Sequence, residues 1–168
     1  MQAFFTAISL AQAISTPQIQ TLLNSISLKS QSAAGCLAIV ITKFKPQVME
    51  DLWNMTAAAD PRHKVIGILA IGQVGKIKDL SFEPRVLSTV TSLFKSPSDD
   101  VRTAASICLG NVSVGNPGYL DKVFELVDKS KDDQKYLFLN TIREIIIHNA
   151  GCLEAYNFQL TSLLLNHT

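Results

Sequence analysis

One stretch of the chain, residues 96–116, constrains the fold strongly because turn residues and a glycine bound a helical pattern. Its sequence is SPSDDVRTAASICLGNVSVGN. Apolar and small side chains recur on one face with a period of about 3.6 residues, which is typical of an amphipathic helix. They are Val101, Ala104, Ala105, Cys108, Leu109 and Val112. Small residues, including Gly110, should let another helix approach this one closely.

Both ends of this helix carry capping signals. Either Ser96, which precedes a proline, or Ser98, which precedes two aspartates, can cap the N-terminus, and the aspartates favour the positive end of the helix dipole. At the other end Gly115 precedes an Asn-Pro pair. We expect Gly115 to take the left-handed conformation that ends many helices.

Comparable helices recur along the chain. A shift of 33 residues carries the apolar positions of 102–112 onto 135–145, and those of 66–74 onto 33–41. Gly72 and Gly110 are 38 residues apart, and the extra residues fall in the polar connection 76–81, where an insertion costs little. Each of these helices follows a helix of another type. The repetition therefore indicates a stack of helical hairpins, an α-solenoid.

No stretch shows sustained alternation with a period of two residues, so the sequence predicts an all-α fold. We expect a single solenoid segment over residues 1–168, with half a repeat at each end, a helix over 2–14 and one from about Cys152 onward. The four complete hairpins are expected at about 17–44, 46–77, 82–115 and 117–149. Their first helices should cover 17–28, start at Pro46, cover 83–95 and start at Pro117.

Acidic residues precede a basic residue where the second helix of several hairpins begins, a pattern that resembles HEAT repeats of the armadillo-like superhelix class. We expect these charges to form a ladder along the solenoid. They are Asp60 with Lys64, Asp99 and Asp100 with Arg102, and Asp132 and Asp133 with Lys135.

Composition excludes several classes of function. Hydrophobic residues make up 47% of the chain and charged residues 17%, with a net charge of +1, which excludes a disordered protein and gives no basic stripe for nucleic acid. No apolar run reaches the length of a membrane span. The apolar N-terminus and the sequons at Asn54, Asn111 and Asn166 leave a secreted helical domain as an alternative. The odd number of cysteines favours reduced thiols in a cytosolic protein.

Residue types that carry chemistry do not form a recognisable site, so we expect no catalytic, cofactor-binding or metal-binding residues. The histidines and cysteines lack zinc-ligand spacing; they are His63, His148, His167, Cys36, Cys108 and Cys152. We interpret Cys108 as a core residue rather than a nucleophile, and Trp53 as a core residue rather than an interface anchor. An acidic cluster alternates with lysines as a solvated face does; it comprises Asp121, Glu125, Asp128, Asp132 and Asp133.

Residues from Leu69 onward resemble a known family. The runs LAIGQVGKIKDLS, FKSPSDDVRTAASICLGNVSVGN and QKYLFLNTIREII are similar to the cullin-associated and neddylation-dissociated family of HEAT-repeat proteins. The match is best over residues 69–146, and the string AAS-x-x-LGN-x-SVGN, followed by Tyr119 and Leu120, is its most particular part.

The resemblance implies a non-enzymatic binding protein from the C-terminal half of the family's solenoid. Its partner would be a cullin–RING-box complex, and it would regulate assembly or exchange of the substrate-receptor modules of cullin–RING ubiquitin ligases in the cytoplasm and nucleus. It implies no nucleic acid, membrane or small-molecule substrate, and partner-binding residues stay unknown. The alternative is another HEAT scaffold, such as a karyopherin-like carrier or a phosphatase scaffold.

Overall fold

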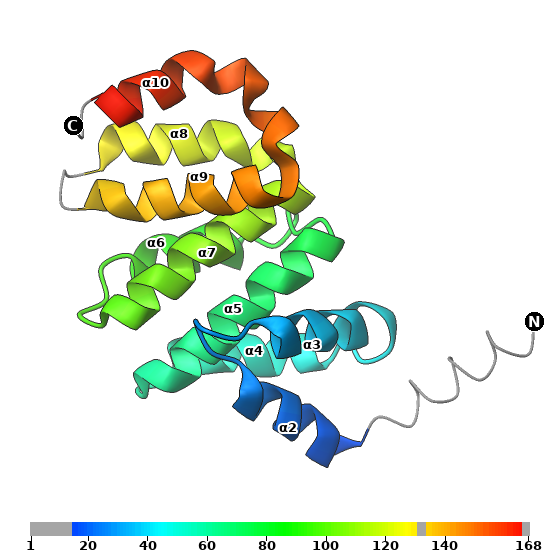
Figure 1. The fold of residues 1–168 in the computed structure, drawn as a ribbon. Coiled ribbons are helices and arrows are strands. Elements are labelled where there is room, and N and C mark those ends of the chain that lie inside the picture. Colours follow the sequence, from blue (N-terminus) through cyan, green and yellow to red (C-terminus); the bar gives the residue numbers. More distant parts are fainter. Residues whose placement is uncertain (1–14, 131–133, 166–168) are drawn as a thin grey trace, which may run out of the picture.

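The computed structural model describes residues 15–130 and 134–165, and most of this part of the chain is helical (Figure 1). The expected helix over 2–14, the residues Asp132, Asp133, Asn166 and His167 and one end of the acidic cluster lie outside the described residues. The elements are α2 (Thr16–Ser25), α3 (Ser32–Lys43), α4 (Val48–Ala57), α5 (Pro61–Ile77), α6 (Arg85–Leu93), α7 (Asp99–Gly115), η1 (Pro117–Tyr119), α8 (Leu120–Lys129), α9 (Lys135–Asn149), η3 (Ala150–Tyr156) and α10 (Asn157–Leu165).

Successive helices pack into an elongated stack with α2 at one end and α10 at the other (Figure 1). The second helices of the hairpins form one continuous layer, in which α3 packs on α5, α5 on α7 and α7 on α9. Apolar side chains from both kinds of helix join a single core. This arrangement confirms the predicted all-α solenoid of HEAT-type hairpins.

Helix α7 lies at the centre of the layer, and most of its residues are buried. The predicted apolar face is confirmed, since Val101, Ala104, Ala105, Cys108, Leu109 and Val112 are all inaccessible to solvent. Of the two proposed caps, Ser98 is the one used: its Oγ accepts a hydrogen bond from the backbone N–H of Val101, at 3.4 Å.

Gly115 corrects one expectation from the sequence. No described glycine has a positive φ, so Gly115 is the last residue of α7 and not a left-handed cap. A Cβ at this position would overlap the carbonyl oxygen of Gly75 on α5. The residue must be glycine because two backbones touch there, and the helix ends on the extended backbone of Asn116.

Three helix boundaries differ from the expected ones. Helix α2 ends at Ser25, before residue 28, because Ser27 and Ser30 exchange two backbone hydrogen bonds and turn the chain. Helix α5 continues through Lys76 to Ile77, because lysine favours helix and the connection begins only at Lys78. After α9 the chain forms the 3₁₀ segment η3 before α10, so the last expected helix has two parts.

Close contacts between helices depend on glycine. A Cβ on Gly72 would lie 2.9 Å from the Cα of Cys108, and one on Gly110 would lie 2.7 Å from the carbonyl oxygen of Thr141. Such distances are too short for packed atoms, so these positions need glycine for the α5–α7 and α7–α9 contacts. The predicted close approach at the small-residue face of α7 is therefore confirmed.

Candidate protein-binding surface

The three cysteines lie in different surroundings. Cys108 is fully buried, and burial raises the pKa of its thiol, so the core interpretation is confirmed. Cys36 is exposed on α3, while Cys152 is partly buried and its thiol donates to the carbonyl oxygen of Asn149, at 2.9 Å. A buried neutral thiol is a poor nucleophile, because the thiolate is the reactive form.

Histidines and acidic residues do not converge on a metal-like site. Within residues 15–130 and 134–165 no group of three or more His, Cys, Asp or Glu side chains could hold a metal ion. His63 lies 3.8 Å from Asp60 at the start of α5, far along the chain from His148 on α9. The same part of the chain contains no helix that is both long and apolar enough to cross a membrane.

The described members of the acidic cluster lie on the exposed face of α8. Glu125 pairs with Lys129 one turn later, and Asp121 accepts a hydrogen bond from the hydroxyl of Tyr156, at 2.6 Å. These contacts give Asp121 and Glu125 partners within the protein, as a solvated helix face does.

Trp53 is a packed residue of α4, which confirms its core interpretation. The guanidinium of Arg85 lies 4.8 Å above its ring, an arrangement that favours a cation–π contact. Arg85 also donates to Glu50 and Glu83, and these hydrogen bonds lower the pKa of both carboxyl groups. The cluster therefore joins the first helices α4 and α6 of neighbouring hairpins.

The charges at the start of α7 take a different form from the expected ladder. Arg102 pairs with Asp99 on its own helix and donates to the hydroxyl of Tyr136 on α9, at 3.0 Å. The contact between hairpins thus uses a tyrosine hydroxyl in addition to charge.

A polar contact that the sequence did not predict spans the layer of second helices. The Nζ of Lys76, at the end of α5, lies 3.1 Å from Nε2 of His148, at the end of α9. Glu144 lies 3.9 Å from the same histidine, and partial burial lowers the pKa of Lys76. Lys76 and His148 are 72 residues apart, so only the stacking of α5, α7 and α9 brings them together.

Asn111, the sequon residue on α7, has no solvent-accessible surface, and neither polar atom of its side chain has a partner. A glycan cannot be attached at this position in the folded chain.

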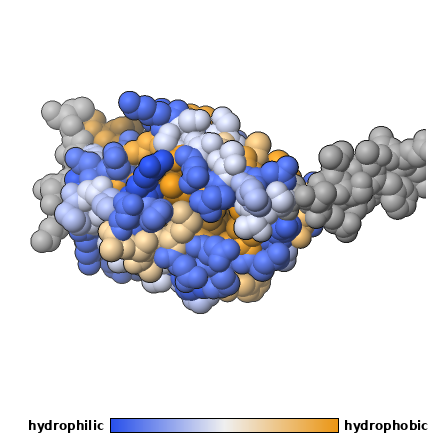
Figure 2. Space-filling model, turned by 90° about the horizontal axis from the view of Figure 1, so that it is seen from below, coloured by the Kyte–Doolittle hydropathy of each residue, from blue (hydrophilic) through white to orange (hydrophobic). Residues whose placement is uncertain are grey.

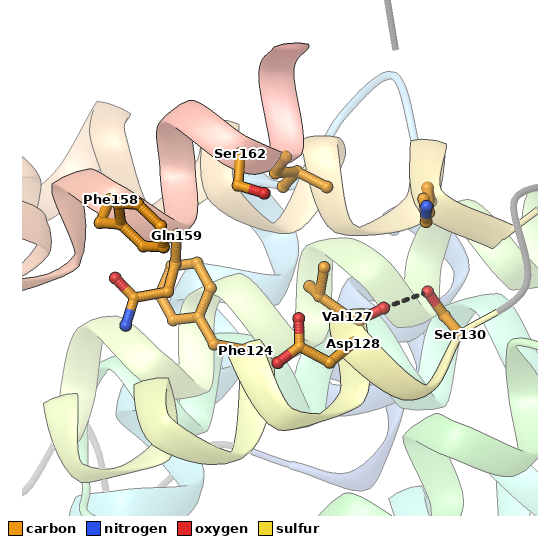
Figure 3. A pocket seen from close by; sticks show the side chains of 9 residues that line it. Phe124, Val127, Asp128, Ser130, Phe158, Gln159 and Ser162 are labelled. Carbon is orange, nitrogen blue, oxygen red and sulfur yellow. Dashed lines mark hydrogen bonds between the residues drawn. The ribbon is translucent and has the colours of Figure 1, made fainter. Parts of the chain in front are cut away.

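A shallow pocket of about 340 Å³ lies between α8 and α10 (Figure 3). Phe124 forms one wall and stacks on Tyr156, with ring centroids 4.8 Å apart. Phe158 and Gln159 of α10 border the opening, and Phe158 is 84% exposed. Aromatic surface beside single polar groups suits contact with another protein chain.

Exposed apolar side chains concentrate at the α9–α10 end of the stack. Most of the large ones in the described part of the chain lie there: Ile146, Ile147, Phe158, Leu164 and Leu165. At the opposite end a groove of about 440 Å³ lies between α2 and α4. Figure 2, which views that end of the stack, shows apolar patches between polar side chains.

Comparison with known proteins connects this architecture to one family. No family model matches the chain. The chain is 32% identical over 109 residues to a cullin-associated NEDD8-dissociated protein 1 of Arabidopsis thaliana, which is 61% of this chain and 9% of that protein. It is also 32% identical over 120 residues to the Drosophila melanogaster protein of that name, covering 68% and 10%.

A third relative, from Emericella nidulans, is named as the C-terminal part of such a protein and is 31% identical over 104 residues, 60% of this chain and 10% of the relative. That name agrees with the expected place in the C-terminal half. The chain spans about a tenth of the length of these curated relatives. The sequence identity and the HEAT-type stack together confirm the relationship of this chain to the cullin-associated NEDD8-dissociated family.

Proposed function

We propose that this chain is part of a non-enzymatic HEAT scaffold that binds a cullin–RING-box complex and helps to regulate the exchange of substrate-receptor modules on cullin–RING ubiquitin ligases. The observation that carries the proposal is the similarity to relatives whose names describe them as cullin-associated. We also propose a cytoplasmic and nuclear location, and we propose that the four hairpins are the repeat units of the scaffold.

The architecture is suited to such a role. Each hairpin adds surface to a continuous stack, so a long partner can be held by many modest contacts and no deep pocket is required. Cys108 is buried in the core, the acidic residues Asp121 and Glu125 have partners within the chain, and His63 and His148 lie on different helices.

A binding experiment with two forms of the partner tests the proposal. A cullin–RING-box complex is prepared with and without its ubiquitin-like modifier, and calorimetry measures binding to this chain and to the much longer Drosophila relative. We expect the relative to bind only the unmodified complex. This chain should bind the same form more weakly. A stable interface needs roughly 800 Å² per partner, and this chain offers only part of the surface of the longer relative.

Competition provides the control. An excess of the unmodified complex should displace this chain from a labelled complex, whereas the modified complex should not. Equal binding to both forms, or no binding of this chain even at high concentration, would contradict the cullin assignment and leave a HEAT scaffold with another partner.

A further inference from the structure

A lysine and a histidine meet across the layer of second helices. The Nζ of Lys76 on α5 lies 3.1 Å from Nε2 of His148 on α9, and each is the residue before the last of its helix. Helix α7 packs against both α5 and α9. The contact therefore reaches past α7 and links two helices that are not adjacent in the layer.

The contact defines the protonation state of the imidazole ring. A lysine ammonium group carries three donors and no acceptor, so Nε2 of His148 must accept the hydrogen bond from Lys76. A ring nitrogen accepts a hydrogen bond only while it carries no proton. His148 is therefore neutral in this arrangement, and its ring proton is on Nδ1.

Glu144 offers the same ring nitrogen a second partner. It lies one turn before His148 on α9, and its carboxylate oxygen is 3.9 Å from Nε2. The close approach of α7 at Gly110 leaves the side chain of Glu144 only 12% exposed. A protonated ring donates from both nitrogens, so it can pair with this carboxylate. The two partners of Nε2 thus suit the two charge states of the ring.

Lys76 and Glu144 are the charges that act directly on this ring. Partial burial lowers the pKa of Lys76, and the negative charge of Glu144 opposes that shift. The nearby end of α7, residues 113–115, carries no titratable side chain.

The other charged or titratable groups of the adjoining elements have different contacts. Among the described residues the ring of His148 forms no hydrogen bond or ion pair with them; they are residues 78–79 after α5, 121–122 on α8, and Arg143, Cys152 and Glu154. Asp79 accepts from Asn116, Asp121 accepts from Tyr156, and the Cys152 thiol donates to a backbone carbonyl. The charge state of His148 therefore decides which of its two partners it contacts.

We propose that His148 is a pH-sensitive switch: the neutral ring accepts from Lys76 and links α9 to α5, and the protonated ring pairs with Glu144 and releases Lys76. Protonation would otherwise leave two positive charges side by side, and these repel. Histidine ordinarily takes up a proton near about pH 6.5. The link therefore supports the fold above this range and is lost as the pH falls through it. The switch does not depend on the cullin assignment.

Nitrogen NMR of the histidine rings in the whole chain distinguishes the two states. At about pH 8 we expect the ring proton of His148 on Nδ1 and an unprotonated Nε2. Lys76→Met keeps the packed part of the side chain but removes the donor, so the proton should move toward Nε2, which then faces Glu144 alone. A neutral ring with its proton on Nε2 in the unaltered chain would overturn the proposal.

A double-mutant cycle measures the link itself. Lys76→Met, His148→Phe and the double variant are unfolded with urea at about pH 8 and at about pH 5. At the higher pH the pair should change the unfolding equilibrium constant by about threefold beyond the separate effects. At the lower pH this coupling should vanish or reverse, because two positive charges then face each other. Equal coupling at both pH values would contradict the switch.

Matched variants separate this switch from other effects of acid. In the unaltered chain, hydrogen-exchange protection of residues 145–149 should fall on acidification. His148→Gln keeps an acceptor that does not titrate, so this fall should disappear. Glu144→Gln should move the fall to lower pH, because the protonated ring loses its partner. His63→Gln removes the histidine beside Asp60 and should change nothing on α9. Any other result for one of these three variants would overturn the proposal.

Discussion

At Gly115 the identity of a single residue is set by a neighbouring backbone. The position lies in ordinary helical geometry, and the carbonyl oxygen of Gly75 occupies the space in which a Cβ would stand. Gly35 on α3 offers the contrast, because a Cβ there would meet nothing within 4 Å. Two helical glycines therefore have opposite tolerances to substitution.

Replacement of these glycines separates the two explanations for Gly115. Asparagine tolerates a left-handed cap, so Gly115→Asn would be mild if the cap mattered. We expect instead that Gly115→Asn and Gly115→Ala both lower the free energy of unfolding by several kcal/mol, since a Cβ at this position forces α5 and α7 apart. Gly35→Ala should raise it by about 0.5–1 kcal/mol. Urea denaturation measures all three, and a mild Gly115→Asn would contradict the packing explanation.

Cys108 predicts a difference in thiol reactivity. With a disulfide reagent near neutral pH, exposed Cys36 should react quickly, whereas Cys108 should react only after unfolding. Because burial raises the pKa of Cys108, the folded state keeps the neutral thiol. This contribution to stability is complete below the ordinary thiol pKa of 9.0 and is lost as the pH rises above it.

Mass spectrometry of the modified chain identifies the residue that reacted, and Cys108→Ser serves as the control for assignment. Rapid labelling of Cys108 in the native chain would show that α5 and α7 open readily.

Some features of helix α7 can be predicted from its own sequence. Its apolar face and its start within two residues follow from local rules, because periodicity and capping chemistry act within a turn or two. The role of Gly115 does not, because the expected left-handed cap does not form and the contact with Gly75 requires the glycine. Which serine caps it does not follow, since Ser96 and Ser98 carry the same hydroxyl. In the structure the Oγ of Ser96 instead accepts from the N–H of Ser98, at 3.3 Å.

Single substitutions test this choice of cap. Ser98→Ala should lower the free energy of unfolding by about 1 kcal/mol, because an N–H at the helix start loses its acceptor. Ser96→Ala should cost distinctly less, and Ser98→Asp should retain stability. Thermal unfolding followed by circular dichroism measures the order, and equal costs for the two alanine variants would show that both serines share the role.

Other features of the surface could not be predicted because they depend on distant parts of the chain. Lys76 meets His148 only after the intervening second helix, α7, has packed between α5 and α9, and no local sequence pattern indicates that spacing. The exposure of Phe82 has no local sequence signal, because it depends on the turn at residues 79–83. Trp53 was predictable as a core residue, but its cation partner Arg85 was not.

At the scale of the whole molecule, the two ends of the stack differ from its middle. The second helices α5 and α7 in the middle of the stack are buried along most of their length, whereas α10 exposes Phe158 and Leu164. Apolar surface that is exposed in a contiguous area favours association. We therefore expect the isolated chain to associate through the exposed apolar side chains at the α9–α10 end of the stack.

Sedimentation velocity tests this expectation. We expect the chain to self-associate as its concentration rises, because the exposed side chains of α9 and α10 bury apolar surface when two chains meet. Phe158→Ser combined with Leu164→Ser should shift the equilibrium toward monomer, while Phe82→Ser should not. A monomer at all concentrations, with strong amide protection in residues 153–165, would contradict the prediction.

The backbone contact between Gly75 and Gly115 also has a mechanical consequence. A stack of hairpins can bend, and it bends most easily at the contacts between neighbouring helices. The contact between α5 and α7 should resist bending, because the two backbones touch and the hydrogen bond between Lys76 and His148 ties α9 to α5. Bending under load should therefore concentrate at the seam of α8 and α10, where unfilled volume remains. A partner that changes the curvature of the protein would do so there.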